Sequence, residues 1–337
     1  MDDLKNFDLN ELKEIIKNLG FEQFRAKQVY EWIYNKEVLD IVEMKNLPEK
    51  LRQKLKQNYT LFSLKIKQIQ ESKDGTKKIL YELKDGYKIE SVLIPDDDRT
   101  TLCISSQAGC GCGCRFCATG KLGFKRNLET AEIIEEFILA EKENKKKIDN
   151  VVFMGMGEPL LNWENVKKAI LIISDKSGRN FSQSRITVST IGIVPKIKEI
   201  AESDLKFYLA ISLVAADDKM RSELVPFNEK YGLKDIIEIS RYYNKKTGRE
   251  ITYEYVMLQN KNDSDEDAKK IIKILKGIKC KINLIPYNVN EKFEFKKPET
   301  ERVLKFQKIL LDAGFKVFIR KEKGSDISAA CGQLAGK

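Results

Sequence analysis

The sequence contains no histidine among its 337 residues. Imidazole is the side chain that titrates nearest to neutral pH, and it is both the commonest general base and a common metal ligand. Catalysis by a Ser-His or Cys-His pair, and metal binding through imidazole, are therefore excluded. Proton transfer must fall to carboxylates, lysines, tyrosines or thiols.

Long apolar runs are also missing. No stretch approaches the roughly 20 apolar residues that a membrane-spanning helix needs, and the opening Met1-Asp2-Asp3 has no secretory signal pattern. A hydrophobic content of 42% and a charged content of 33% are typical of a soluble protein with one large domain and one or two smaller ones. We expect a cytoplasmic monomer with no membrane partner.

Acidic residues are in the minority. Lysine and arginine number 61 against 51 aspartates and glutamates, which gives a formal net charge of +10 and a sequence pI of about 9.0. This excess favours a polyanionic partner such as a nucleic acid. It is weak support by itself, because lysine-rich faces are often only solvated surface.

Cysteine is scarce overall but concentrated in one place. Of 7 cysteines, five lie between Cys103 and Cys117, and Cys110, Cys114 and Cys117 have the spacing C-x3-C-x2-C. The interleaved glycines allow a tight loop in which several thiolates converge. Soft sulfur ligands at such spacing select zinc or an iron–sulfur cluster.

The alternatives for this loop differ in how many ligands they need. A disulfide framework is disfavoured in a chain that can bury a full core and shows no secretory signal. Structural zinc needs four closed ligands, so Cys112 or Cys103 would have to complete the set. A cubane cluster held by three cysteines leaves one iron open to a small molecule, and this spacing is typical of enzymes that use S-adenosylmethionine as a radical source.

Residues 1–58 have helical patterning, with an apolar stripe that opens at Leu9 and a second helix over 24–34. Tyr30, Trp32 and Tyr34 alternate there with basic residues. The aromatic side chains fit the core of a small helical domain, or a platform on which RNA bases stack while cations meet phosphates. We predict a helical accessory domain that binds RNA.

Residues 59–95 change to strands punctuated by Asp74-Gly75 and Asp85-Gly86. Asp-Gly between alternating runs is a strong hairpin signal, so we predict a three-stranded antiparallel meander as a linker. Glu90 lies in its last strand.

Residues 96–320 alternate between strand and helix patterns. The sequence predicts strands at 101–105, 151–154, 185–189, 207–213, 251–258, 281–285 and 316–320. It predicts helices at 130–142, 163–173, 195–201, 233–244, 265–275 and 299–313. Strict alternation predicts parallel units and an α/β fold with a partial (β/α)6 barrel. Ligands of such folds gather at the carboxyl ends of the strands, where the cysteine loop and the loop with Gly155 and Gly157 would lie, and residues 321–337 would form a C-terminal loop.

Five motifs follow one another along the chain. They are Ser105-Ser106-Gln107-Ala108-Gly109-Cys110, Cys117-Ala118-Thr119-Gly120, Met154-Gly155-Met156-Gly157-Glu158-Pro159-Leu160-Leu161-Asn162, Ser189-Thr190-Ile191-Gly192-Ile193-Val194-Pro195 and Asp326-Ile327-Ser328-Ala329-Ala330-Cys331-Gly332-Gln333-Leu334. In this order they resemble the RlmN/Cfr family, the radical S-adenosylmethionine methyltransferases of RNA adenine. The resemblance spans essentially the whole chain.

The resemblance implies roles for individual residues. Cys110, Cys114 and Cys117 match the ligands of a 4Fe-4S cluster. Cys331 matches a cysteine that is itself methylated, Cys103 a second essential cysteine, and Glu90 a proposed acid–base carboxylate. The matches to S-adenosylmethionine contacts are Gly157, Glu158, Ser189, Ser212, Leu213, Val214 and Asn288. Val214 departs from the family pattern, which has histidine there.

The resemblance also implies a radical reaction, because adenine C2 is electron-poor and cannot attack a methyl donor. One S-adenosylmethionine methylates Cys331, and a second, cleaved by the cluster, yields a radical that takes hydrogen from the new methyl group. The carbon radical adds to adenine, and a disulfide with Cys103 releases the RNA. The protein positions these groups and excludes water.

Two branches of the family remain open. The segment 156–162 and the stretch 94–99 resemble RlmN, which methylates C2, whereas the segment 189–193 and the glycine-rich cysteine loop resemble Cfr, which methylates C8. We favour C2, with 23S rRNA and tRNA as partners and an unidentified low-potential electron donor. An alternative of another class is a non-catalytic iron–sulfur or zinc protein that binds RNA.

Overall fold

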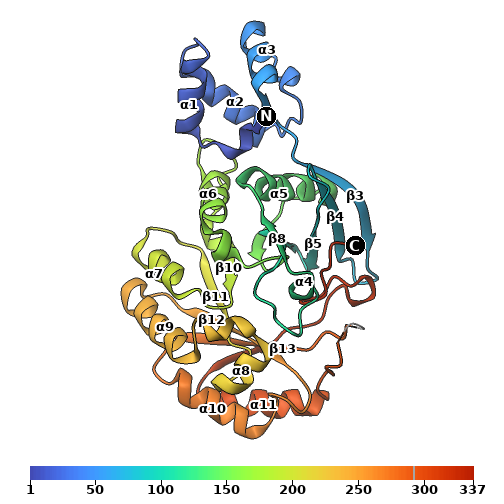
Figure 1. Ribbon diagram of the computed structural model, residues 1–337, viewed down its shortest axis with the longest axis vertical. Coiled ribbons are helices and arrows are strands. Elements are labelled where there is room, and N and C mark those ends of the chain that lie inside the picture. Colours follow the sequence, from blue (N-terminus) through green and yellow to red (C-terminus); the bar gives the residue numbers. More distant parts are fainter. Residues whose placement is uncertain (291–292) are drawn as a thin grey trace.

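A helical N-terminal part adjoins an open mixed sheet whose parallel strands are connected by helices (Figure 1). The computed structural model describes residues 1–290 and 293–337. Within these residues, no helix combines the length and apolar character needed to cross a membrane.

The N-terminal part consists of α1 (Leu9–Asn18), α2 (Arg25–Tyr34) and α3 (Glu49–Asn58), together with η1 (Leu4–Asn6) and η2 (Ile41–Glu43). A capping box begins α1, because the Asp8 carboxylate accepts from Glu11 N–H and the Glu11 side chain accepts from Asp8 N–H. The short strands β1 (Asp2–Asp3) and β2 (Tyr59–Thr60) pair in parallel. This pairing joins the two ends of the helical part.

The aromatic side chains of α2 divide between core and surface. Tyr30 and Tyr34 are fully buried, and the Tyr30 hydroxyl donates to the carbonyl of Ile172 at 3.3 Å. The core interpretation is therefore confirmed for both tyrosines. Trp32 is only half-buried, and the Lys36 ammonium lies 3.7 Å from its ring centroid.

One ten-stranded sheet organises the rest of the chain, in the order β14-β13-β12-β11-β10-β9-β6-β5-β4-β3. Its parallel section contains β6 (Arg99–Cys103), β9 (Asn150–Phe153), β10 (Ile186–Thr190), β11 (Tyr208–Ser212), β12 (Ile251–Met257), β13 (Cys280–Pro286) and β14 (Lys316–Ile319). The connecting helices are α5 (Thr130–Asn144), α6 (Trp163–Ser174), α7 (Val194–Glu202), α9 (Leu233–Thr247), α10 (Asp265–Leu275) and α11 (Thr300–Asp312). These elements lie within three residues of the predicted ranges. Among the described residues the edge strands β14 and β3 do not pair, so the sheet stays open. This confirms the predicted α/β fold with a barrel that is only partial.

The predicted meander continues this sheet. Strands β3 (Leu64–Glu71), β4 (Lys77–Leu83) and β5 (Lys88–Asp96) are antiparallel, and β5 pairs with β6, with Val92 opposite Cys103. The turns at Asp74-Gly75 and Asp85-Gly86 lie where the sequence predicts them. The segment thus extends the main sheet directly, and the proposed domain boundaries stay predictions.

The sequence did not predict several short elements around the cysteine loop. They are β7 (Gln107–Gly109) and β8 (Phe124–Asn127), which form a hairpin, and the helices α4 (Ala118–Lys121) and α8 (Asp218–Leu224). Elements of three to seven residues are too short for hydrophobic periodicity to show. The remaining 3-10 turns are η3 (Pro159–Asn162), η4 (Gln183–Arg185), η5 (Pro226–Glu229) and η6 (Ser325–Ile327).

Candidate active site

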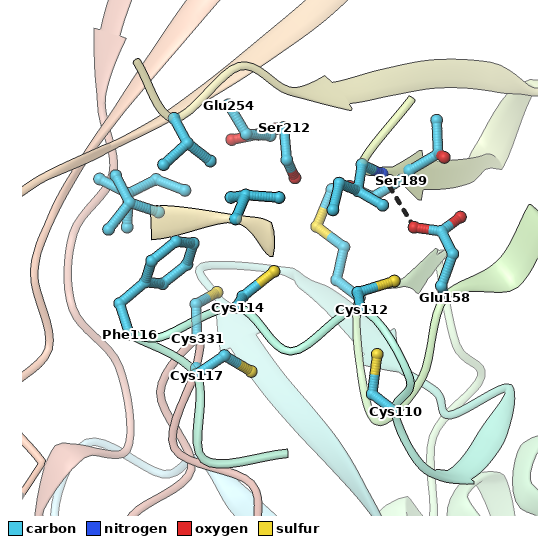
Figure 2. A pocket seen from close by; sticks show the side chains of 18 of the residues that line it. Cys110, Cys112, Cys114, Phe116, Cys117, Glu158, Ser189, Ser212, Glu254 and Cys331 are labelled. Carbon is cyan, nitrogen blue, oxygen red and sulfur yellow. Dashed lines mark hydrogen bonds between the residues drawn. The ribbon is translucent and has the colours of Figure 1, made fainter. Parts of the chain in front are cut away.

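A cavity of about 180 Å³ lies at the carboxyl ends of the parallel strands. Lining residues come from the ends of β9 to β13, from the cysteine loop and from the C-terminal loop (Figure 2). Ten of the thirteen predicted site residues line it: Cys110, Cys114, Cys117, Gly157, Glu158, Ser189, Ser212, Val214, Asn288 and Cys331. Segments more than two hundred residues apart in sequence thus meet at the edge where ligands of parallel sheets bind.

The cysteine loop connects β7 to α4 and needs glycine for a steric reason. Gly109 has a φ of +73°, and a Cβ there would lie 1.9 Å from the carbonyl oxygen of Gly123. The loop therefore closes against its own far end. Figure 2 shows the sulfur atoms of Cys110, Cys114 and Cys117 around one common space.

The thiols influence one another electrostatically. Burial raises the pKa of Cys114, and the neighbouring Cys117 and Cys110 raise it further. Cys112 is buried beside Cys110, and a hydrogen bond from its thiol lowers the pKa of Cys110. Three thiolates so close together are unfavourable unless a cationic centre offsets their charge.

Gly155 and Gly157 follow β9 and approach the chain itself very closely. A Cβ on Gly155 would lie 2.6 Å from the Ile104 carbonyl oxygen, and one on Gly157 would lie 2.6 Å from Cβ of Gln107. The structure therefore gives these glycines a packing reason, where the sequence had suggested close approach by a ligand. Together they seat the β9 loop against the segment that carries the cysteines.

Glu158 connects two strand ends. Its carboxylate accepts from Leu160 N–H at 2.9 Å and from Ile191 N–H at 2.8 Å, and it is 4% exposed. Burial raises the pKa of this carboxyl to about 7, although the backbone hydrogen bonds oppose the shift. Glu158 thereby holds the loop after β9 against the loop after β10.

The next strand ends contribute both polar and apolar groups. Ser189 and Ser212 line the cavity, whereas Leu213 is fully buried and lies outside its lining. Val214 lines it with a φ of +65°, a conformation that is strained for a β-branched residue. The Asn288 amide donates to the carbonyl of Cys331 at 3.0 Å, so this side chain holds the C-terminal loop.

Sequence reasoning missed two charged residues here. Arg221, on α8, is fully buried and donates to the carbonyls of Ile191 at 2.6 Å and of Leu213 at 3.0 Å. Burial lowers the pKa of Arg221 to about 10, and the Cys114 thiolate opposes that shift. No pattern pointed to this arginine, because it lies between predicted elements.

Glu254 is the second missed residue. It lines the cavity from β12, is 7% exposed and accepts from the Asn283 amide at 2.9 Å. Burial raises the pKa of this carboxyl. A glutamate within the otherwise uncharged strand Ile251–Met257 was the available signal.

Cys103 and Glu90 lie outside the lining of the cavity. Cys103 ends β6 and is buried, which raises its pKa, and the Cys331 thiolate raises it further, so the two sulfurs interact. Cys331 has an exposed side chain at the cavity (Figure 2). Glu90 is fully buried on β5 and pairs with Lys78 at 3.2 Å.

Comparison with known proteins agrees with this geometry. The sequence model of the radical SAM superfamily matches residues 104–273, and that of the ribosomal RNA large subunit methyltransferase N-terminal domain matches residues 2–61. "Probable dual-specificity RNA methyltransferase RlmN" of Thermotoga petrophila is 48% identical over 99% of this chain and 97% of that protein. The chain belongs to the RlmN family of radical S-adenosylmethionine RNA methyltransferases.

Other RlmN relatives agree. "Dual-specificity RNA methyltransferase RlmN" of Geotalea uraniireducens is 44% identical over 99% of this chain and 97% of that protein. The crystal structure of a radical SAM methyltransferase from Sphaerobacter thermophilus covers 100% of both chains, with a TM-score of 0.97 and 39% identity. The predicted resemblance is confirmed, and membership in an RlmN enzyme family favours catalysis over a non-catalytic binding module.

Membership in the radical SAM superfamily implies a 4Fe-4S cluster and S-adenosylmethionine, and the site residues of this chain fit both. Three half-buried thiols surround one space, and their mutual repulsion calls for a cationic centre. Among the described residues no three Cys, Asp or Glu side chains converge closely enough for a single ion. The C-x3-C-x2-C spacing and the match to the radical SAM superfamily are what favour a cluster over zinc.

Proposed function

We propose that the protein methylates C2 of an adenine in RNA through an S-methylated Cys331. The observation that carries this proposal is the presence of Cys331 in the same cavity as the three cluster thiols, and the Cys331 thiol also raises the pKa of the buried Cys103. No general methyl transfer would require two further cysteines at this place. The names of the relatives support RNA as the substrate.

The cofactors supply the hard chemistry. When bound, the cluster and S-adenosylmethionine provide the one-electron reduction that starts radical chemistry. Cys110, Cys114 and Cys117 would hold the cluster. Glu158 and Arg221 keep the strand ends in place around it, and Ser189 and Ser212 offer hydroxyls to the polar part of S-adenosylmethionine.

The chain's own residues then carry the transfer. The Cys331 thiol accepts a methyl group and loses its proton. That methyl group would lose one hydrogen atom to the radical that the cofactors supply, and its carbon would bond to adenine C2; the adduct then loses the C2 proton and one electron, for which the cluster would be the acceptor. The Cys103 thiolate attacks the sulfur of Cys331 to form a disulfide, and the sulfur–carbon bond breaks with its electron pair left on carbon, which takes a proton to become the methyl group. The low polarity around Cys103 keeps its thiol protonated, so the resolving step needs a base.

A base is also needed to remove the proton from adenine C2. The resemblance gives the role to Glu90, yet in this conformation its carboxylate is buried and contacts Lys78 and backbone amides. Proton removal from C2 by Glu90 would need the substrate to reach it through a change in the C-terminal loop. We propose the role on the family pattern alone.

The partners follow from the family. We propose an adenosine of 23S rRNA and an adenosine of tRNA as substrates, with a low-potential protein as electron donor. The helical N-terminal part supplies exposed cations that would bind the RNA backbone, with Lys17, Lys27 and Lys36 at its surface.

The decisive test is anaerobic purification with reconstituted iron and sulfide, followed by incubation with S-adenosylmethionine, a reductant and RNA. Nucleoside mass spectrometry of rRNA and tRNA should show 2-methyladenosine. 8-Methyladenosine would replace the C2 assignment with C8. Absence of any methylated adenosine, with the cluster loaded and S-adenosylmethionine cleaved, would contradict the proposal.

A further inference from the structure

The C-terminal segment 321–337 begins on the turn between β3 and β4. The Asp74 carboxylate accepts from Gly324 N–H at 2.9 Å, and the Asp326 carboxylate accepts from the Ser72 hydroxyl at 2.5 Å and from Lys73 N–H at 3.2 Å. A Cβ on Gly324 would lie 2.8 Å from the Thr76 side chain. The start of the segment is therefore tied to the first Asp-Gly turn of the meander.

The middle of the segment is tied to the cavity. The Gly332 carbonyl accepts from Ala118 N–H at 2.7 Å, and the Leu334 carbonyl accepts from the Thr119 hydroxyl at 2.7 Å. Both donors belong to α4, directly after Cys117. The part that carries Cys331 thus lies against the cysteine loop.

The end of the segment is held by Glu90. One oxygen of its carboxylate accepts from Ala335 N–H at 2.7 Å and from Gly336 N–H at 2.9 Å, while the other pairs with Lys78. The Glu90 side chain is fully buried. The two backbone amides therefore make the hydrogen bonds of this buried carboxylate, while its other oxygen meets Lys78 only as an ion pair.

We propose that Glu90 and Asp74 are positioning residues that clamp both ends of the C-terminal segment and so hold Cys331 at the cavity. The proposal rests on the proposed function for the role of Cys331. Asn288 and Ala118 hold the backbone at Cys331 and Gly332, but residues 329–332 are small, so the anchoring of the ends limits how far the Cys331 sulfur can move. Anchoring at both ends confines the sulfur, which raises its effective concentration at the reacting methyl group.

The test separates the hydrogen-bond acceptor from the charge. The first double variant, Lys78→Met with Glu90→Gln (the Glu90→Gln pair), keeps a carbonyl acceptor for the two amides, and it leaves no buried Lys78 ammonium without a counter-charge. The second, Lys78→Met with Glu90→Leu (the Glu90→Leu pair), removes the acceptor. Asp74→Ala removes the contact with Gly324 and so loosens the other end, where Asp326 still holds Ser72 and Lys73. Asp98→Ala is its matched control, because Asp98 is an exposed aspartate in the turn between β5 and β6.

Two measurements report the clamp, in the reconstituted full-length enzyme without RNA. Hydrogen exchange of the peptide 333–337 should be about tenfold faster in the Glu90→Leu pair, the effect of losing a charge-assisted hydrogen bond. Without RNA each protein is methylated once, so the single-turnover rate constant of methyl transfer to Cys331 should fall while the S-adenosylmethionine concentration at half-maximal rate stays unchanged. The Glu90→Gln pair should restore both, because neither readout involves the proton of adenine C2. Asp74→Ala should slow methyl transfer, and Asp98→Ala should match the wild type.

Equal exchange in the wild type and the Glu90→Leu pair would overturn the proposal, as would equal loss in the Leu and Gln pairs. Unfolding midpoints of all variants identify any that merely fail to fold, and Asp74→Ala, far from the cavity, remains as an independent test. If the wild type protects its C-terminal peptide but Cys331 never receives a methyl group, the proposed function fails and the clamp stands.

Discussion

Arg221 holds the carboxyl ends of β10 and β11 together by donating to the backbone carbonyls of Ile191, Ser212 and Leu213. A fully buried guanidinium is costly unless its donors are satisfied. Here the donors meet carbonyls that the strand ends leave free. The cost of burial is thus offset by fixing the loops from which Ser212 and Val214 reach the cavity.

Val214 is a second residue whose meaning depends on its backbone. Its left-handed φ of +65° costs about 1–3 kcal/mol in a non-glycine residue, and histidine and asparagine tolerate this region better than valine. Val214→His should therefore relieve strain and add a polar group to the cavity. We expect S-adenosylmethionine to bind about three- to tenfold more tightly, the worth of one hydrogen bond.

Equilibrium dialysis of the reconstituted protein measures this affinity. Val225→His is the matched control, because Val225 lines the same cavity, is fully buried and has an ordinary φ of −133°. It should lower the unfolding midpoint without tightening binding. Equal weakening of affinity in both variants would contradict the strain argument.

The cysteine loop gives a prediction about single thiols. Cys110→Ala, Cys114→Ala or Cys117→Ala should each abolish the iron–sulfur chromophore, because each removes a ligand. Cys112→Ala should retain it, since Cys112 is a hydrogen-bond partner of Cys110. Absorbance and iron content after anaerobic reconstitution check this, and loss of iron in Cys112→Ala would show that the cluster uses a fourth thiol.

At the scale of elements, the first residues of the chain are bound to α5 by a buried ionic group. Lys5 contacts Asp3 at 3.0 Å and Glu135 at 3.4 Å, and Glu135 also accepts from Ser63 N–H at 2.7 Å. All three ionic side chains are buried. The N-terminal part is therefore attached to the sheet through polar contacts that must be fully satisfied.

This group predicts a pH dependence of stability. Burial raises the pKa of Glu135 to about 7 from a usual 4.5, although Lys5 opposes the shift. Between these values the folded state keeps a proton that the unfolded state has lost, so this carboxyl makes stability fall as pH rises. Relative to the wild type, the free energy of unfolding of Glu135→Gln should rise across that window.

Denaturant unfolding at several pH values measures the difference. The exposed glutamate Glu164, on α6, provides the control variant Glu164→Gln, whose curve should run parallel to that of the wild type. A constant difference between Glu135→Gln and the wild type would contradict the assigned pKa.

We expect the exposed lysines on and next to α1 and α2 to make a salt-dependent contact with RNA. Charge reversal of the exposed Lys17, Lys27 and Lys36 should weaken RNA binding and reduce the slope of log affinity against log salt by roughly two. Reversal of the equally exposed Lys245, Lys246 and Lys273, on α9 and α10, is the control. Filter binding over a salt series measures the RNA affinity of both sets of variants. If both sets weaken RNA binding equally, the helical part has no special role in it.

At the scale of the molecule, Cys331 and Cys103 lie more than two hundred residues apart in sequence, yet Cys331 is close enough to raise the pKa of the buried Cys103 thiol. Under the proposed mechanism the two single mutants fail at different stages. Cys331→Ala should carry no methyl group on protein or RNA, because the acceptor is gone. Cys103→Ala should accumulate covalently joined to RNA, because the resolving thiol is missing.

Denaturing gels with labelled RNA distinguish these states, and mass spectrometry of the C-terminal peptide reports the methyl group. Cys280→Ala is the control, since Cys280 is buried at the start of β13, away from the cavity. Release of free methylated RNA by Cys103→Ala would contradict the two-cysteine mechanism.

Much of the fold followed from local pattern. The alternation of strand and helix, the two Asp-Gly turns and the capping box of α1 act over a few residues, so the sequence alone determined the order of elements and the open α/β sheet. The cysteine spacing and the five motifs determined which residues gather at the carboxyl edge. Residues that follow successive parallel strands must gather at one edge of the sheet, because the carboxyl ends of parallel strands all lie there.

Other features were decided only by tertiary structure. Arg221 carries no local signal, because its partners are carbonyls supplied by other segments. Glu254 stands out as a charge within β12, but its partner, the Asn283 amide, comes from the neighbouring strand. Gly155 and Gly157 are required by close approach to Ile104 and Gln107, about fifty residues earlier in the chain. The contact of Glu90 with Ala335 and Gly336 joins residues 245 and 246 positions apart. A hydrogen bond across such a distance depends on how the sheet places its edges, which no pattern of neighbouring residues encodes.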